Sequence, residues 1–78
     1  MKLELYYFEA CPYCQRVKNY IEETNRKDIV YKDIHADKEA YQTLLEKGGM
    51  DQVPCLMIDD KALYESLDII EWLKNNPE

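Results

Sequence analysis

The first part of the chain contains two apolar segments separated by an amphipathic one. Leu3–Phe8 is a nearly continuous apolar and aromatic run, which is typical of a strand buried on both faces. Residues 15–24 then place apolar side chains at helical spacing, and Ile29–Ile34 is rich in β-branched residues, so a helix and a second strand are expected. This order has the proportions of a βαβ unit, in which the two strands are parallel.

A second helix is predicted after residue 36. Asp37 suits the N-cap position of a helix, and the adjacent Gly48 and Gly49 suit its C-terminal end. Between them, apolar side chains recur on one side of the predicted helix, at Ala40, Tyr41, Leu44 and Leu45.

The last part of the chain predicts a hairpin followed by a third helix. Val53–Ile58 has the composition of a strand, and Ala62–Tyr64 predicts a short strand that returns antiparallel to it. Ser66 is expected to cap the final helix, with Asp68 in its first turn. The residues of this helix that are expected to face inward are Leu67, Ile69, Ile70 and Leu73. The predicted fold class is α/β, in the order βαβαββα, with helices covering a mixed four-stranded sheet.

Length and composition limit the classes of protein that this chain can represent. Its 78 residues predict one domain spanning 1–78, and 46% hydrophobic with 33% charged residues is typical of a globular protein. The formal net charge of −6, without a cluster of Lys and Arg, argues against nucleic acid or an anionic membrane as a partner. No apolar run approaches the roughly 20 residues of a membrane span, and no signal peptide is evident. We expect a cytoplasmic monomer.

The strongest chemical signal is the tetrapeptide Cys-Pro-Tyr-Cys at residues 11–14, between the first strand and the first helix. Residues three apart share a helix face, so the two sulfur atoms are expected to lie within bonding reach. Cys11 would lie at the electropositive end of the helix, where free N–H groups stabilise a thiolate, and is expected to be the nucleophile. Cys14, one turn further along, is expected to be the buried resolving thiol. Pro12 suits the first helical turn.

This tetrapeptide has two alternative interpretations. A zinc or iron–sulfur site would need further ligands, and the remaining candidates, Cys55 and His35, are single residues far apart in the sequence. A structural disulfide across so short a loop would constrain the unfolded chain by only roughly 2 kcal/mol. Three cysteines in a reducing compartment favour redox chemistry. Cys55 is expected to be a small buried residue or an additional regulatory thiol, and His35 a surface residue.

The sequence resembles the glutaredoxins over essentially its whole length. The resemblance rests on Cys-Pro-Tyr-Cys after a first strand and on Val53 and Pro54 about forty residues later. It implies a three-layer thioredoxin-like fold and a cis peptide bond between Val53 and Pro54, beside the cysteines. It also implies that the Val53 backbone pairs with the cysteine part of glutathione. Tyr13 would flank the reactive thiol, and Gln52 replaces a threonine that is common at this position.

Two features depart from the usual glutaredoxin pattern. Glu65 and Ser66 resemble the Glu-Ser motif of glutathione transferase N-terminal domains, where the acid and the serine hold the γ-glutamyl group; the alternative is that Ser66 is only a helix cap. Many glutaredoxins also place a basic residue shortly before the first cysteine, whereas this chain has Glu9 there. A carboxylate at this position opposes a thiolate and an anionic partner. The basic residues that could compensate for it are Arg16, Lys18 and Lys47.

The expected function is glutathione-dependent reduction of protein disulfides or glutathione mixed disulfides by Cys11 and Cys14. Glutathione would be a co-substrate, and no tightly bound cofactor or metal is expected. One alternative is a redoxin reduced by thioredoxin reductase that donates electrons to ribonucleotide reductase. Another is a metal-binding module, a dimer sharing an iron–sulfur cluster or zinc through Cys11, with Cys55 as a further candidate ligand.

Overall fold

The computed structural model describes residues 1–78 and contains the predicted order of strands and helices, with one additional π-helical turn, η1. The elements are β1 (Leu3–Tyr7), α1 (Pro12–Glu23), β2 (Ile29–Asp33), α2 (Lys38–Thr43), η1 (Leu44–Gly48), β3 (Cys55–Ile58), β4 (Lys61–Tyr64) and α3 (Ser66–Asn75). None of the helices is long and apolar enough to span a membrane.

The four strands form one mixed sheet in the order β2-β1-β3-β4. β1 pairs parallel with β2 and antiparallel with β3, and β3 pairs antiparallel with β4, which confirms the predicted βαβ unit and hairpin. All five residues of β1 are buried, including Glu4, so this strand is covered on both faces as the apolar run predicted. β3 begins at Cys55 rather than at Val53 because Pro54 has no N–H to donate to a strand ladder.

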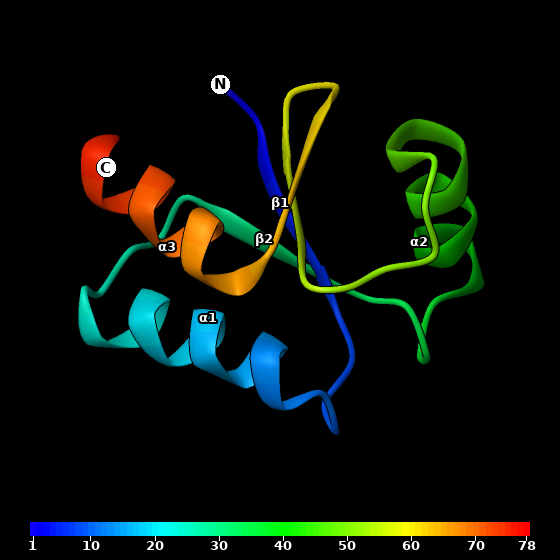
Figure 1. Ribbon diagram of the computed structural model, residues 1–78, viewed down its shortest axis with the longest axis horizontal. Coiled ribbons are helices and arrows are strands. Elements are labelled where there is room, and N and C mark those ends of the chain that lie inside the picture. The colour runs from blue at the N-terminus through cyan, green and yellow to red at the C-terminus, as the bar shows by residue number, and fades with distance from the viewer.

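Two clusters of buried side chains lie on opposite faces of the sheet. Helices α1 and α3 cover one face, and α2 covers the other (Figure 1). Because successive side chains of a strand point to opposite faces, Leu5 and Tyr7 pack against α1 and α3 while Tyr6 packs toward α2. The sheet therefore separates Cys11 and Cys14, on the α1 side, from Cys55, on the α2 side.

The second helix is capped as predicted but ends in a wider turn. The Asp37 carboxylate accepts a hydrogen bond from the Glu39 backbone N–H at 2.9 Å, which satisfies a free donor of the first turn. The last turn, η1, is π-helical, and Gly49 ends it with a φ of 76°, in the left-handed region. The glycine pair therefore ends the helix as expected.

The start of α3 differs from the prediction in two ways. Ser66 is the first residue of the helix and not its cap, because the chain reverses one residue earlier, at Glu65, where φ is 72°. Leu67 is 65% exposed rather than facing inward. The buried positions of α3 are Ser66, Ile69 and Leu73, and Leu67 lies about 100° around the helix from Ser66.

Three buried groups are expected to make the reduced protein less stable in alkali. Burial raises the pKa of Cys14 to about 12 and that of Cys55 to about 11, and burial together with the Glu4 carboxylate raises that of Tyr6 to about 12. Each of these groups has a higher pKa in the folded state than in the unfolded state. Its contribution to the free energy of unfolding is fully present below the unfolded-state pKa and is lost as the pH rises through the folded-state pKa. The two thiols have an unfolded-state pKa of about 8.5, so the free energy of unfolding should begin to fall near pH 8.5. Each thiol should lower it by up to about 1.4 kcal/mol per pH unit.

Urea unfolding of the reduced protein, followed through Trp72, the only tryptophan, would measure this effect between pH 7 and 11. The Cys55→Ala variant should show a shallower pH dependence because one of the three groups is gone. A free energy of unfolding that stays constant from pH 8 to 11 would contradict the burial of these ionisable groups.

Candidate active site

Cys11 occupies the N-cap of α1, and Pro12 is the first residue of the helix, as the sequence predicted. The Cys11 sulfur accepts a hydrogen bond from the Cys14 backbone N–H at 3.1 Å. The Cys11 sulfur therefore lies at the N-terminal end of the helix, beside the free backbone N–H groups of its first turn. Cys11 is 5% exposed and Cys14 is completely buried. The two thiols therefore differ in access to a substrate.

Cys14 is held as a neutral thiol. Burial, and then its hydrogen bond with Cys11, raise the pKa of Cys14 to about 12, so almost no thiolate forms there at neutral pH. Because the thiolate is the attacking species in disulfide exchange, the arrangement favours Cys11 as the first nucleophile. All three cysteines of the chain are free thiols in this structure.

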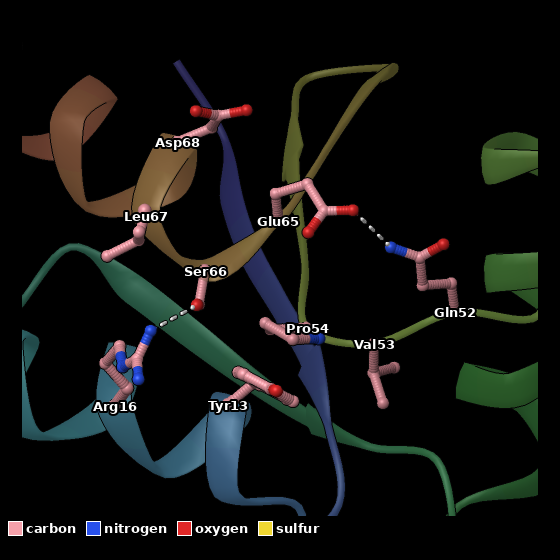
Figure 2. Close-up of a pocket in the computed structure, with 9 residues that line it drawn as sticks. All are labelled: Tyr13, Arg16, Gln52, Val53, Pro54, Glu65, Ser66, Leu67 and Asp68. Carbon is pink, nitrogen blue, oxygen red and sulfur yellow. Dashed lines mark hydrogen bonds between the residues drawn. The ribbon is translucent and has the colours of Figure 1, made fainter.

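A cavity of about 580 Å³ opens between α1, the segment before β3 and the start of α3 (Figure 2), and Tyr13, which precedes Cys14 in the sequence, lines it. The six predicted ligand-contacting residues all line it: Tyr13, Gln52, Val53, Pro54, Glu65 and Ser66. The Val53–Pro54 peptide bond is cis, as the resemblance implied. Three segments that are far apart in the sequence thus meet in one site.

Two hydrogen bonds connect the walls of this cavity (Figure 2). The Gln52 side chain donates to the Glu65 carboxylate at 3.2 Å, which joins the segment before β3 to the start of α3. The Arg16 guanidinium approaches the Ser66 hydroxyl oxygen at 3.5 Å and lies 5.5 Å from the centre of the Tyr13 ring. Ser66 is buried and faces α1, so its hydroxyl belongs to the cavity wall.

Three lining residues were not predicted as ligand contacts: Arg16, Leu67 and Asp68. Arg16 was considered only as a compensating surface charge, yet it is the one basic residue of the cavity. A sequence signal for it exists, because Arg16 is three residues after Tyr13 and so shares its helix face. Leu67 and Asp68 follow Ser66 directly, in the first turn of α3.

The charge of Glu9 is compensated locally. Lys18 forms an ion pair with the Glu9 carboxylate at 3.0 Å, and the Gln15 side chain donates to the same carboxylate at 3.3 Å. The hydrogen bond from Lys18 lowers the pKa of Glu9. The Lys18 ammonium also lies 4.6 Å from the centre of the Tyr7 ring. Lys18 is therefore paired with Glu9, and Lys47 is paired with Asp60. Of the three basic residues considered for compensating the charge of Glu9, only Arg16 lines the cavity.

The third cysteine, Cys55, lies on the opposite face of the sheet from Cys11 and Cys14. Cys55 is completely buried on the α2 face of the sheet, and burial raises its pKa to about 11. Cys11 and Cys55 lie on opposite faces, so they are not positioned to bind one metal ion within a chain. No group of three or more His, Cys, Asp or Glu side chains is arranged to hold a metal. His35 is exposed as predicted, but its ring stacks on Phe8.

This combination of sheet, helix layers and dithiol defines a protein of the thioredoxin-like fold. The crystal structure of the thioredoxin-like protein BC3987 superposes with a TM-score of 0.79 at 27% identity, covering 95% of this chain and 97% of that one. Glutathione transferase Omega 3C from Trametes versicolor gives a TM-score of 0.80 at 33% identity, covering 96% of this chain and 33% of the transferase.

Sequence comparison shows which family of thioredoxin-like proteins the chain belongs to. Residues 5–78 match the family described as glutathione S-transferase, N-terminal domain. Glutaredoxin 1 from Escherichia coli is 32% identical over 73 residues, covering 86% of each protein, and Glutaredoxin 1 from Shigella flexneri matches equally well. The chain belongs to the glutaredoxin family of thiol–disulfide oxidoreductases, and it carries the Glu-Ser pair that resembles the transferase motif.

Proposed function

We propose that the protein reduces protein disulfides and glutathione mixed disulfides through Cys11 and Cys14, with glutathione as the electron donor. The observation that carries this proposal is one cavity that joins Tyr13, from the Cys-Pro-Tyr-Cys segment, to Val53, Pro54, Glu65 and Ser66. Such a dithiol works where the thiol pool is kept reduced, so we place the protein in the cytosol.

The chemistry of the cavity wall suits the γ-glutamyl end of glutathione. The first turn of α3 offers free backbone N–H groups, and the Ser66 hydroxyl and the Arg16 guanidinium lie beside it, so together they would bind a carboxylate. The exposed Glu65 carboxylate is available for the adjacent ammonium group. The Val53 backbone would pair with the cysteinyl part, as the family resemblance implies.

The reaction proceeds by two thiol–disulfide exchanges. The Cys11 thiolate attacks the glutathionyl sulfur of a mixed disulfide, the bond to the protein sulfur breaks, and the released protein thiolate takes a proton from solvent. A second glutathione, as its thiolate, then attacks the Cys11–glutathione bond, which frees Cys11 and releases oxidised glutathione. For an intramolecular protein disulfide, the Cys11 thiolate first forms a mixed disulfide with one substrate sulfur, and the other substrate sulfur leaves as a thiolate that takes a proton from solvent. Cys14 then attacks the Cys11 sulfur and gives up its proton to the departing substrate thiolate, and the resulting Cys11–Cys14 disulfide is reduced by two molecules of glutathione.

Reduction of the oxidised protein in two parallel assays tests the proposal. One contains glutathione, glutathione reductase and NADPH, and the other contains thioredoxin reductase and NADPH. We expect rapid NADPH oxidation in the glutathione assay. Arg16→Leu should raise the KM for glutathione roughly 10-fold or more, as expected for the loss of a charged hydrogen bond.

Lys74→Gln serves as the matched control, because it also removes one positive charge but lies exposed in the last turn of α3, away from the cavity. Its KM should equal that of the unmodified protein. Turnover only with thioredoxin reductase would reject glutathione as the donor, and an equal rise in KM for both variants would reject Arg16 as a ligand contact.

A further inference from the structure

A second cavity, of about 480 Å³, lies on the other side of the segment that precedes β3. Gln52 and Val53 line both cavities and form the wall that they share. Cys11 lines the second cavity and not the first. The reactive thiol is therefore approached through a space that the proposed glutathione site does not fill.

The walls of the second cavity are mainly apolar and aromatic. The Phe8 and His35 rings are stacked, with their centres 4.3 Å apart and their planes 15° from parallel. Ile34 and Tyr41 add further apolar surface. A flat aromatic wall of this kind favours an apolar or aromatic side chain of a ligand.

One carboxylate gives this cavity its charge. Asp51 accepts a hydrogen bond from the Tyr41 hydroxyl at 2.9 Å and lies exposed at the cavity, and no Lys or Arg lines it. The chain as a whole carries a net charge of −6. The cavity is thus complementary to a cationic group and repels a carboxylate.

We propose that the second cavity binds the polypeptide half of a glutathione mixed disulfide, and that it selects substrates with an apolar or aromatic side chain and a Lys or Arg next to the modified cysteine. This inference rests on the proposed function. The two halves of such a disulfide need separate sites that meet at the reactive sulfur, and the two cavities meet at Gln52 and Val53. The exchange is the one described above: Cys11 keeps the glutathionyl group, and the peptide leaves as a thiol after taking a proton from solvent.

Two glutathionylated hexapeptides of equal length provide the test. One has Phe and Lys beside the cysteine and the other has Ser and Glu, and the mixed disulfide of glutathione with 2-mercaptoethanol is the reference substrate without a peptide. We expect kcat/KM for the Phe-Lys peptide to exceed that for the Ser-Glu peptide by about 10-fold, the scale of electrostatic discrimination at a binding site.

The preference should depend on Asp51 in particular. Asp51→Lys should reduce the ratio of the two kcat/KM values several-fold, since it removes the attraction for the basic peptide and the repulsion of the acidic one. The contact of Phe with the aromatic wall would account for the preference that remains. Glu71→Lys makes the same charge change at an exposed position of α3 outside both cavities, and it should leave the ratio unchanged. The ratio is independent of the fraction of each variant that folds.

Failure of this inference is distinguishable from failure of the proposed function. Reduction of the reference substrate with no preference between the peptides, or a preference that Asp51→Lys leaves unchanged, would overturn the peptide site and leave the glutathione mechanism standing. An equal change with Glu71→Lys would assign the preference to overall charge and also overturn the site. Failure to reduce the reference substrate with glutathione would reject both.

Discussion

Replacement of Cys11 by serine is expected to abolish reduction of every disulfide substrate. A serine hydroxyl at the N-cap keeps the hydrogen bond from the Cys14 backbone N–H but supplies no nucleophile for a disulfide sulfur. We expect kcat/KM to fall by more than roughly 1,000-fold, as is usual when a covalent nucleophile is removed. The glutathione-coupled assay, with a glutathione mixed disulfide as substrate, measures this loss.

Cys14→Ala is the matched variant. It removes the second thiol, but the backbone N–H that contacts the Cys11 sulfur remains. We therefore expect reduction of glutathione mixed disulfides to continue, and reduction of intramolecular protein disulfides to fall sharply because the resolving thiol is gone. A loss equal to that of Cys11→Ser on both substrates would mean that Cys14, despite its burial, makes the first attack.

Replacement of Gly48 by alanine is expected to destabilise the fold. A Cβ atom at Gly48 would collide with the Tyr64 hydroxyl oxygen, which is buried between the helical turn and the sheet. Overpacking of this kind costs roughly 1–3 kcal/mol. For a domain of this size, a cost of about 2 kcal/mol corresponds to a fall in Tm of roughly 8–16 °C, which thermal unfolding would detect.

Two companion variants identify the cause. Tyr64→Phe removes a buried hydroxyl that has no hydrogen-bond partner, so alone it should be neutral or slightly stabilising, and it should restore most of the stability lost in Gly48→Ala. Gly49→Ala, where a Cβ meets no atom within 4 Å but φ is 76°, should cost about 1 kcal/mol through backbone strain alone, with no rescue by Tyr64→Phe. If Tyr64→Phe does not restore stability to Gly48→Ala, the collision with the Tyr64 hydroxyl is not the cause of the destabilisation.

Much of the fold could be predicted because it depends on local patterns. The burial of β1 followed from a nearly continuous apolar run, and the ends of α2 followed from Asp37 and the glycine pair. The exposure of Leu67 was missed because several apolar residues crowd the first turn of α3, and the pattern alone did not show which of them faces the sheet. The chain reversal at Glu65, a non-glycine residue with positive φ, also has no local sequence signal.

The site was less predictable where it depends on contacts between distant segments. The predicted glutathione contacts came from a family resemblance, and no periodicity would have brought Tyr13 and Glu65 together in one cavity. The stacking of His35 on Phe8 joins the end of β1 to the end of β2, and its formation depends on the parallel register of the two strands. The second cavity, which depends on that stack, was therefore not visible in the sequence.

The backbone at Glu65 is unfavourable for the residue that occupies it. Its φ is 72°, a conformation that costs roughly 1–3 kcal/mol for residues other than glycine. Glycine at this position would relieve the strain but would remove a carboxylate that lines the cavity. The stability of the fold and the proposed glutathione site therefore place opposite demands on residue 65.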